Sequence, residues 1–83
     1  MTECELYVRD LFYLLREAAA EARRNQAADP RDGLESGRAA AYVEVLLLMQ
    51  SQADSFMIPR ERLGMAGFDP LLDPLDPPLD RIK

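Results

Sequence analysis

The sequence DPRDGLE, residues 29–35, separates two long segments rich in apolar residues. Pro30 pushes the residue before it out of the helical region, so one helix cannot run through this point. Asp32 is a favourable N-cap residue, and Glu35 follows three positions later, the spacing of a capping box that starts a new helix. A short loop of this kind places two helices side by side and antiparallel. The stretch therefore predicts a helical hairpin.

The segment before this turn has the pattern of an amphipathic helix. Thr2 and Glu5 stand three positions apart, so they form a capping-box pair near the start of the chain. Apolar residues then recur at alternating spacings of four and three, as on a helix that packs along one side. We expect a helix from about residue 3 to about residue 27, with this seam: Cys4, Val8, Leu11, Leu15, Ala18 and Ala22.

The segment after the turn is apolar on almost every side. We expect a helix from about residue 33 to about residue 58, ended by Pro59. One seam along this helix consists of Ala39, Tyr42, Leu46, Met49, Ala53 and Phe56. A second seam, which we expect to face the first helix, consists of Leu34, Ala41, Val45 and Leu48.

A hairpin buries one face of each helix, so the second helix has apolar surface to spare. We predict that two chains bury this surface together in a four-helix bundle, because two-fold dimers are the commonest symmetric assemblies. The predicted interface is Tyr42, Val43, Leu46, Leu47, Met49, Ala53 and Phe56. Two alternatives remain open at this point: the C-terminal segment folds back over the surface, or a different protein covers it.

The C-terminal segment is rich in proline and cannot be helical throughout. After Pro59, the sequence PRERLG predicts one helical turn that Gly64 stops. Proline then recurs with aspartate and leucine, which excludes a helix or a central strand and favours an extended chain. We divide the single domain into a helical hairpin region, residues 1–68, and an extended docking tail, residues 69–83. The predicted docking residues, on the chain's own helices or on a partner, are Leu71, Leu72, Leu75 and Leu79.

The sequence lacks the residue types that carry most catalysis and metal binding. There is no histidine, and Cys4 is the single cysteine, so neither a zinc cluster nor a nucleophile paired with imidazole can form. No glycine-rich phosphate-binding loop occurs either. We predict that the chain is not an enzyme and binds no cofactor or metal. Cys4 we expect to be a small packed hydrophobe.

Glu44 is the one charged residue inside the most apolar stretch, AAAYVEVLLLM, residues 39–49. It is a candidate buried acid, which would serve proton chemistry or anchor an arginine of a partner. The open alternative is a carboxylate that reaches the edge of the bundle or pairs with an arginine of its own dimer.

Charge and hydropathy restrict the partners. The net charge of −5 disfavours nonspecific binding to nucleic acid or to an anionic membrane. We find no pattern of a signal peptide or a membrane span, so we expect a cytoplasmic protein, and the alanine- and arginine-rich composition suggests a bacterium or its phage. We expect a non-enzymatic protein–protein interaction module, either an adaptor, a small assembly chaperone or a regulator, which binds itself and another protein. The alternative is an acidic inhibitor from a phage or mobile element that blocks a nucleic-acid-binding groove of a host protein.

Overall fold

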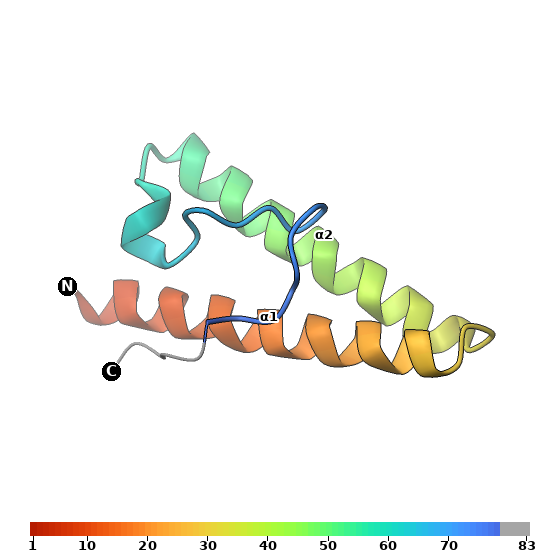
Figure 1. Ribbon diagram of the computed structural model, residues 1–83. Coiled ribbons are helices and arrows are strands. Elements are labelled where there is room, and N and C mark those ends of the chain that lie inside the picture. The colour runs from red at the N-terminus through yellow and green to blue at the C-terminus, as the bar shows by residue number, and fades with distance from the viewer. Residues whose placement is uncertain (79–83) are drawn as a thin grey trace.

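Two long helices lie side by side and are joined by a tight turn (Figure 1). In the computed structural model, which describes residues 1–78, α1 spans Glu3–Ala28, α2 spans Gly33–Ser55, and a short 3-10 helix, η1, spans Arg60–Leu63. Within the described residues there is no strand. The prediction of an all-α chain built on a helical hairpin is confirmed.

Both helices begin at the predicted caps. The Thr2 hydroxyl accepts a hydrogen bond from the Glu5 N–H (3.1 Å), and the Glu5 carboxylate accepts one from the Thr2 N–H (3.3 Å), which completes a capping box. The Asp32 carboxylate accepts from the N–H groups of Leu34 (3.0 Å) and Glu35 (3.3 Å). The reciprocal half of this second box does not form, because the Asp32 N–H donates to the carbonyl of Asp29 instead.

Helix α2 ends at Ser55, earlier than predicted, because the chain closes a Schellman motif there. The Ile58 N–H donates to the Ala53 carbonyl (2.9 Å), and the Met57 N–H donates to the Asp54 carbonyl (3.0 Å). Met57 adopts a left-handed backbone conformation, with φ of 57°, at the position that glycine usually takes. These bonds satisfy carbonyls of the last turn and direct the chain away from the helix axis.

The two helices approach each other at the turn and diverge at the opposite end, where η1 lies between them (Figure 1). Arg9 of α1 fixes η1 by donating hydrogen bonds to the carbonyls of Glu61 (2.9 Å) and Arg62 (3.1 Å). We call residues 64–78 the arm. The arm runs back from η1 toward α2 and then crosses to α1, which it meets at Arg16 (Figure 1).

The core lies between the hairpin and the arm. Its largest fully buried side chains are Phe12 of α1, Leu46 of α2, and Met65 and Pro70 of the arm. Phe12 packs edge-on against Phe68, with the ring centroids 6.0 Å apart. The arm thus supplies a third side of the core, which two helices alone cannot enclose.

The arm also determines which side of each helix is buried. The predicted seams are therefore wrong in part. On α1 Cys4 is exposed rather than packed, and on α2 Leu34 and Leu48 are exposed although we expected them to face α1. The buried stripes are rotated toward the arm, because the arm packs on one side of the hairpin only. The buried residues of the helices are Phe12, Ala19, Ala20 and Ala22 on α1, and Ala39, Val43, Leu46, Gln50 and Ala53 on α2.

Candidate interaction site

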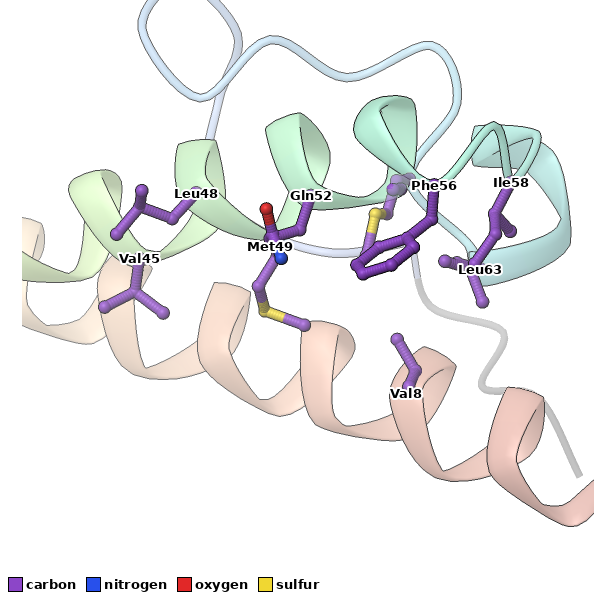
Figure 2. A pocket seen from close by; sticks show the side chains of 10 residues that line it. Val8, Val45, Leu48, Met49, Gln52, Phe56, Ile58 and Leu63 are labelled. Atoms are coloured by element: carbon purple, nitrogen blue, oxygen red, sulfur yellow. The ribbon is translucent and has the colours of Figure 1, made fainter.

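An apolar groove opens between α1 and α2 where the helices diverge, with a volume of about 330 Å³. Met49 and Phe56 extend from α2 toward α1, and Val8 extends from α1 toward them (Figure 2). Gln52 is the one polar residue among those that line it. The lining residues are Val8, Val45, Leu48, Met49, Gln52, Ala53, Phe56, Ile58, Leu63 and Met65.

Large apolar side chains of this groove remain in contact with water. Leu48 is 65% exposed and Phe56 is 68% exposed, while Val45 is 39% exposed. Val45 and Leu48 lie one helical turn apart on α2, and Phe56 follows two turns later as the C-cap residue, so the three form a continuous stripe. Monomeric proteins rarely expose a contiguous apolar surface of this kind, so such a surface often marks a site that binds another molecule.

The residues of the predicted dimer interface differ in how deeply they are buried in the chain. Val43 and Leu46 are buried within the chain itself, so they are not available to a second copy, whereas Ala53 is buried but lines the groove. Phe56 is exposed and lines the groove. The remaining residues are partly buried, and of these Met49 lines the groove as well: Tyr42, Leu47 and Met49.

Val45 and Leu48 line the groove, although the sequence pattern predicted that they pack against α1. The pattern assigned them to the contact between the helices, because two apolar seams on α2 looked equivalent. The polar residues gave no signal, because a glutamine follows each seam, Gln50 one and Gln52 the other, and neither seam carries a charge there. Only the position of the arm distinguishes the two sides.

Glu44 is exposed in the single chain, so it is not buried within the fold itself, and its burial against an arginine of a partner stays a prediction. It lies on the outer side of α2, where it borders a shallow surface with Leu47, Leu48 and Ser51. That side of the helix faces neither α1 nor the arm, which explains why an acidic residue is tolerated in so apolar a stretch. The open alternative, a carboxylate in water at the edge, describes its position.

The arm is anchored to the hairpin by polar groups that donate to its carbonyls. Gln50 is 3% exposed, and its side-chain amide donates to the carbonyls of Met65 (3.3 Å) and Phe68 (2.8 Å). Arg16 lies over the Phe68 ring, with its guanidinium carbon 3.7 Å from the ring centroid, and it donates to the Leu75 carbonyl (3.1 Å). The sequence analysis did not identify either anchor, because each one binds the backbone rather than a recognisable side-chain motif.

The four predicted docking leucines have different environments. Leu75 is buried in the core, whereas Leu71 and Leu72 are mostly exposed. Leu79 lies outside the described residues. The turn at Asp69, whose carbonyl accepts from the Leu72 and Asp73 N–H groups, buries Pro70 and leaves Leu71 and Leu72 on its outer side.

The charged groups form pairs that are spread over the molecule. Ion pairs join Arg24 to Asp76, Arg38 to Glu35, Arg60 to Asp54, and Arg62 to Glu5. The hydrogen bond from Arg62, helped by the Thr2 N–H, lowers the pKa of Glu5 to about 2 from its ordinary value of 4.5. The resulting surface mixes both signs of charge.

Other features of the described residues do not indicate a particular function. In the described part of the chain, no group of three or more acidic or cysteine side chains is placed to hold a metal ion. Neither helix there has the length and hydropathy that crossing a membrane requires. Comparisons of the chain with protein-family models, curated proteins and solved structures found no match.

Proposed function

We propose that this chain is a non-enzymatic protein–protein interaction module and that it forms a homodimer through the groove between α1 and α2. The observation that carries this proposal is the exposed apolar stripe of Val45, Leu48 and Phe56 beside an open groove. Complete burial of one such side chain is worth about 1.5–3 kcal/mol, so covering all three gives a substantial driving force for association.

A second copy of the chain is the occupant that the stripe fits best. A two-fold interface requires a surface that complements itself. Leu34 and Phe56 lie eleven residues on either side of Val45, and Ala41 and Met49 lie four residues on either side. Two antiparallel α2 helices that cross at Val45 would therefore set Leu34 against Phe56 of the partner subunit. They would also set the small Ala41 against the large Met49 of the partner subunit.

This dimer would be a four-helix bundle in which each chain keeps its own arm. Such a module would act as an adaptor, a small assembly chaperone or a regulator, using its outer surface or its arm to bind another protein. We propose a cytoplasmic location and no binding to nucleic acid or membranes, in line with the net charge of −5. The scattered ion pairs favour this function over the acidic inhibitor, which needs one dense negative face.

The test is the molar mass of three proteins by light scattering at micromolar concentration, with reductant present. We expect the wild type to have twice the 9.4 kDa mass of the chain. Leu48→Glu places a charge in the groove and should give a monomer. Leu72→Glu makes the same change on the arm at a side chain that is 83% exposed, so it should stay dimeric.

Two results would overturn the proposal. One is a wild-type monomer throughout the micromolar range. The other is a dimer that survives in Leu48→Glu, since the two chains would then meet at some other surface.

A further inference from the structure

Three residues of the arm, Pro74, Leu75 and Asp76, are seated on α1 by several kinds of contact. Leu75 is 3% exposed and belongs to the core. Arg16 donates from Nε to the Leu75 carbonyl (3.1 Å) and from Nη2 to the Asp76 carbonyl (2.8 Å). Arg24 donates from Nη1 to the Asp76 carboxylate (2.9 Å). Together these contacts recognise a leucine, an aspartate and the direction of the backbone that joins them.

The receiving surface belongs to α1 and is well defined. Arg16 and Arg24 are eight residues apart with Ala20 midway, so the three lie on one side of the helix. Stacking on the Phe68 ring orients the Arg16 guanidinium. Ala20 is small and buried, and it lines a depression beside Pro74. A small apolar seat thus lies between two cations.

The segment that fills this seat has the form of a short linear motif. The flanking prolines restrict the backbone to extended conformations and have no N–H, so the carbonyls of the segment are free to accept from arginine. The triplet Pro-Leu-Asp occurs at residues 74–76 and again at residues 78–80, where Leu79 and Asp80 lie outside the described residues. Proline-rich segments with apolar anchors are common ligands of protein surfaces, because little entropy is lost when they bind.

We propose that Arg16, Ala20 and Arg24 form a recognition site for a Pro-Leu-Asp segment of another protein, and that residues 74–76 occupy this site as an internal competitor. The site lies on the arm side of the hairpin and not in the groove, so it is independent of the proposed dimer. A tethered segment has an effective concentration of about 1 mM. An external segment binds only the fraction of molecules whose arm has left, and its apparent Kd is raised accordingly.

The test is fluorescence anisotropy with a labelled peptide, LDPLDP, which copies residues 72–77. The control peptide, LDPSNP, replaces the leucine and aspartate of the motif. The full-length proteins are the wild type, the double variant Leu75→Ser/Asp76→Asn with a loosened arm, and that double variant with Arg24→Gln added. We expect the loosened variant to bind LDPLDP about tenfold more tightly than the wild type does. The control peptide should lose about tenfold, and the Arg24→Gln variant should lose about two- to threefold, because the ion pair that it removes is exposed.

Circular dichroism shows whether each variant is folded. If the double variant unfolds, Asp76→Asn alone loosens the arm through an exposed ion pair and should tighten peptide binding about two- to threefold. Equal binding by the wild type and a loosened variant would overturn the inference. Equal binding of the two peptides, or none to a folded variant, would also overturn it. Light scattering on the same samples reports the dimer separately, so failure of one proposal is distinguishable from failure of the other.

Discussion

The two sides of α2 are similarly apolar, but residues 1–78, the part of the chain that the structure describes, cover only one of them. Leu46 is 0% exposed beneath the arm, whereas Leu48, two positions further along the helix, is 65% exposed beside the groove. The difference comes from the arm, whose carbonyls are fixed by Gln50 on the covered side. Hydrophobicity alone therefore does not decide which face is buried, because a polar anchor in the right place selects it.

Leu46→Ala should have the largest effect and would show that the covered side carries the stability of the fold. Truncating a fully buried leucine costs about 2–5 kcal/mol, from the lost burial and the cavity left behind. Leu48→Ala at a dilute concentration, where chains are separate, should change the free energy of unfolding by about 0.5 kcal/mol or less. Urea unfolding of both variants measures this. Similar losses in the two variants would mean that the two sides do not differ as described.

Gln50→Leu sharpens the comparison, because it removes the anchor while it keeps an apolar side chain of similar size. The carbonyls of Met65 and Phe68 lose their hydrogen bonds, and an unsatisfied buried group costs about 1–3 kcal/mol. Gln52→Leu is the matched control on the groove side, and it should not destabilise the monomer. Urea unfolding distinguishes the two. A loss in Gln52→Leu as large as that in Gln50→Leu would contradict the role of the anchor.

Met57→Gly changes the end of α2 without altering either face and should be stabilising. Met57 has φ of 57° and its side chain is mostly exposed, so glycine relieves backbone strain and removes little packing. The gain should be about 0.5–1 kcal/mol, because the relief exceeds the extra entropy that glycine loses on folding. Thermal unfolding measures it. A lower midpoint of thermal unfolding than in the wild type would mean that the Met57 side chain makes stabilising contacts.

The smallest expected effect is the pH dependence that comes from Glu5, which ties α1 to η1 through Arg62. The pKa of Glu5 is lowered in the folded chain to about 2, so its contribution is fully present above its ordinary value of 4.5. That contribution is lost as the pH falls through 2. The difference in stability between the wild type and Arg62→Leu should therefore shrink between pH 4.5 and pH 2. A difference that stays constant over this range would exclude the linkage.

The local features of the fold could be predicted from the sequence. Thr2, Pro30 and Asp32 act on their immediate neighbours, so their effect on helix starts and on the turn can be derived from short patterns. The all-α hairpin follows from these residues together with the period of the apolar ones.

The choice of the covered face could not be predicted, because it depends on contacts between distant residues. Gln50 finds its acceptors 15 and 18 positions further along the chain, and nothing in its local sequence distinguishes it from Gln52. The same holds for Leu75, which resembles the other leucines of the arm until Arg16 fixes the backbone around it. The predicted interface therefore combined residues that are buried in the core, such as Leu46, with residues that line the groove, such as Phe56.

We propose that the arm covers one side of α2 and that a second copy covers the other. This is tested by the rate of thiol modification at three single cysteines in a Cys4→Ser background, measured from nanomolar to micromolar protein. Ala20→Cys lies beneath the arm, Leu48→Cys in the groove and Leu72→Cys on the exposed turn of the arm. We expect slow modification at position 20 and fast modification at position 72 at every protein concentration. At 48 the rate should fall as chains associate. A rate at 48 that does not depend on concentration would contradict the proposal, because no second copy would then cover the groove.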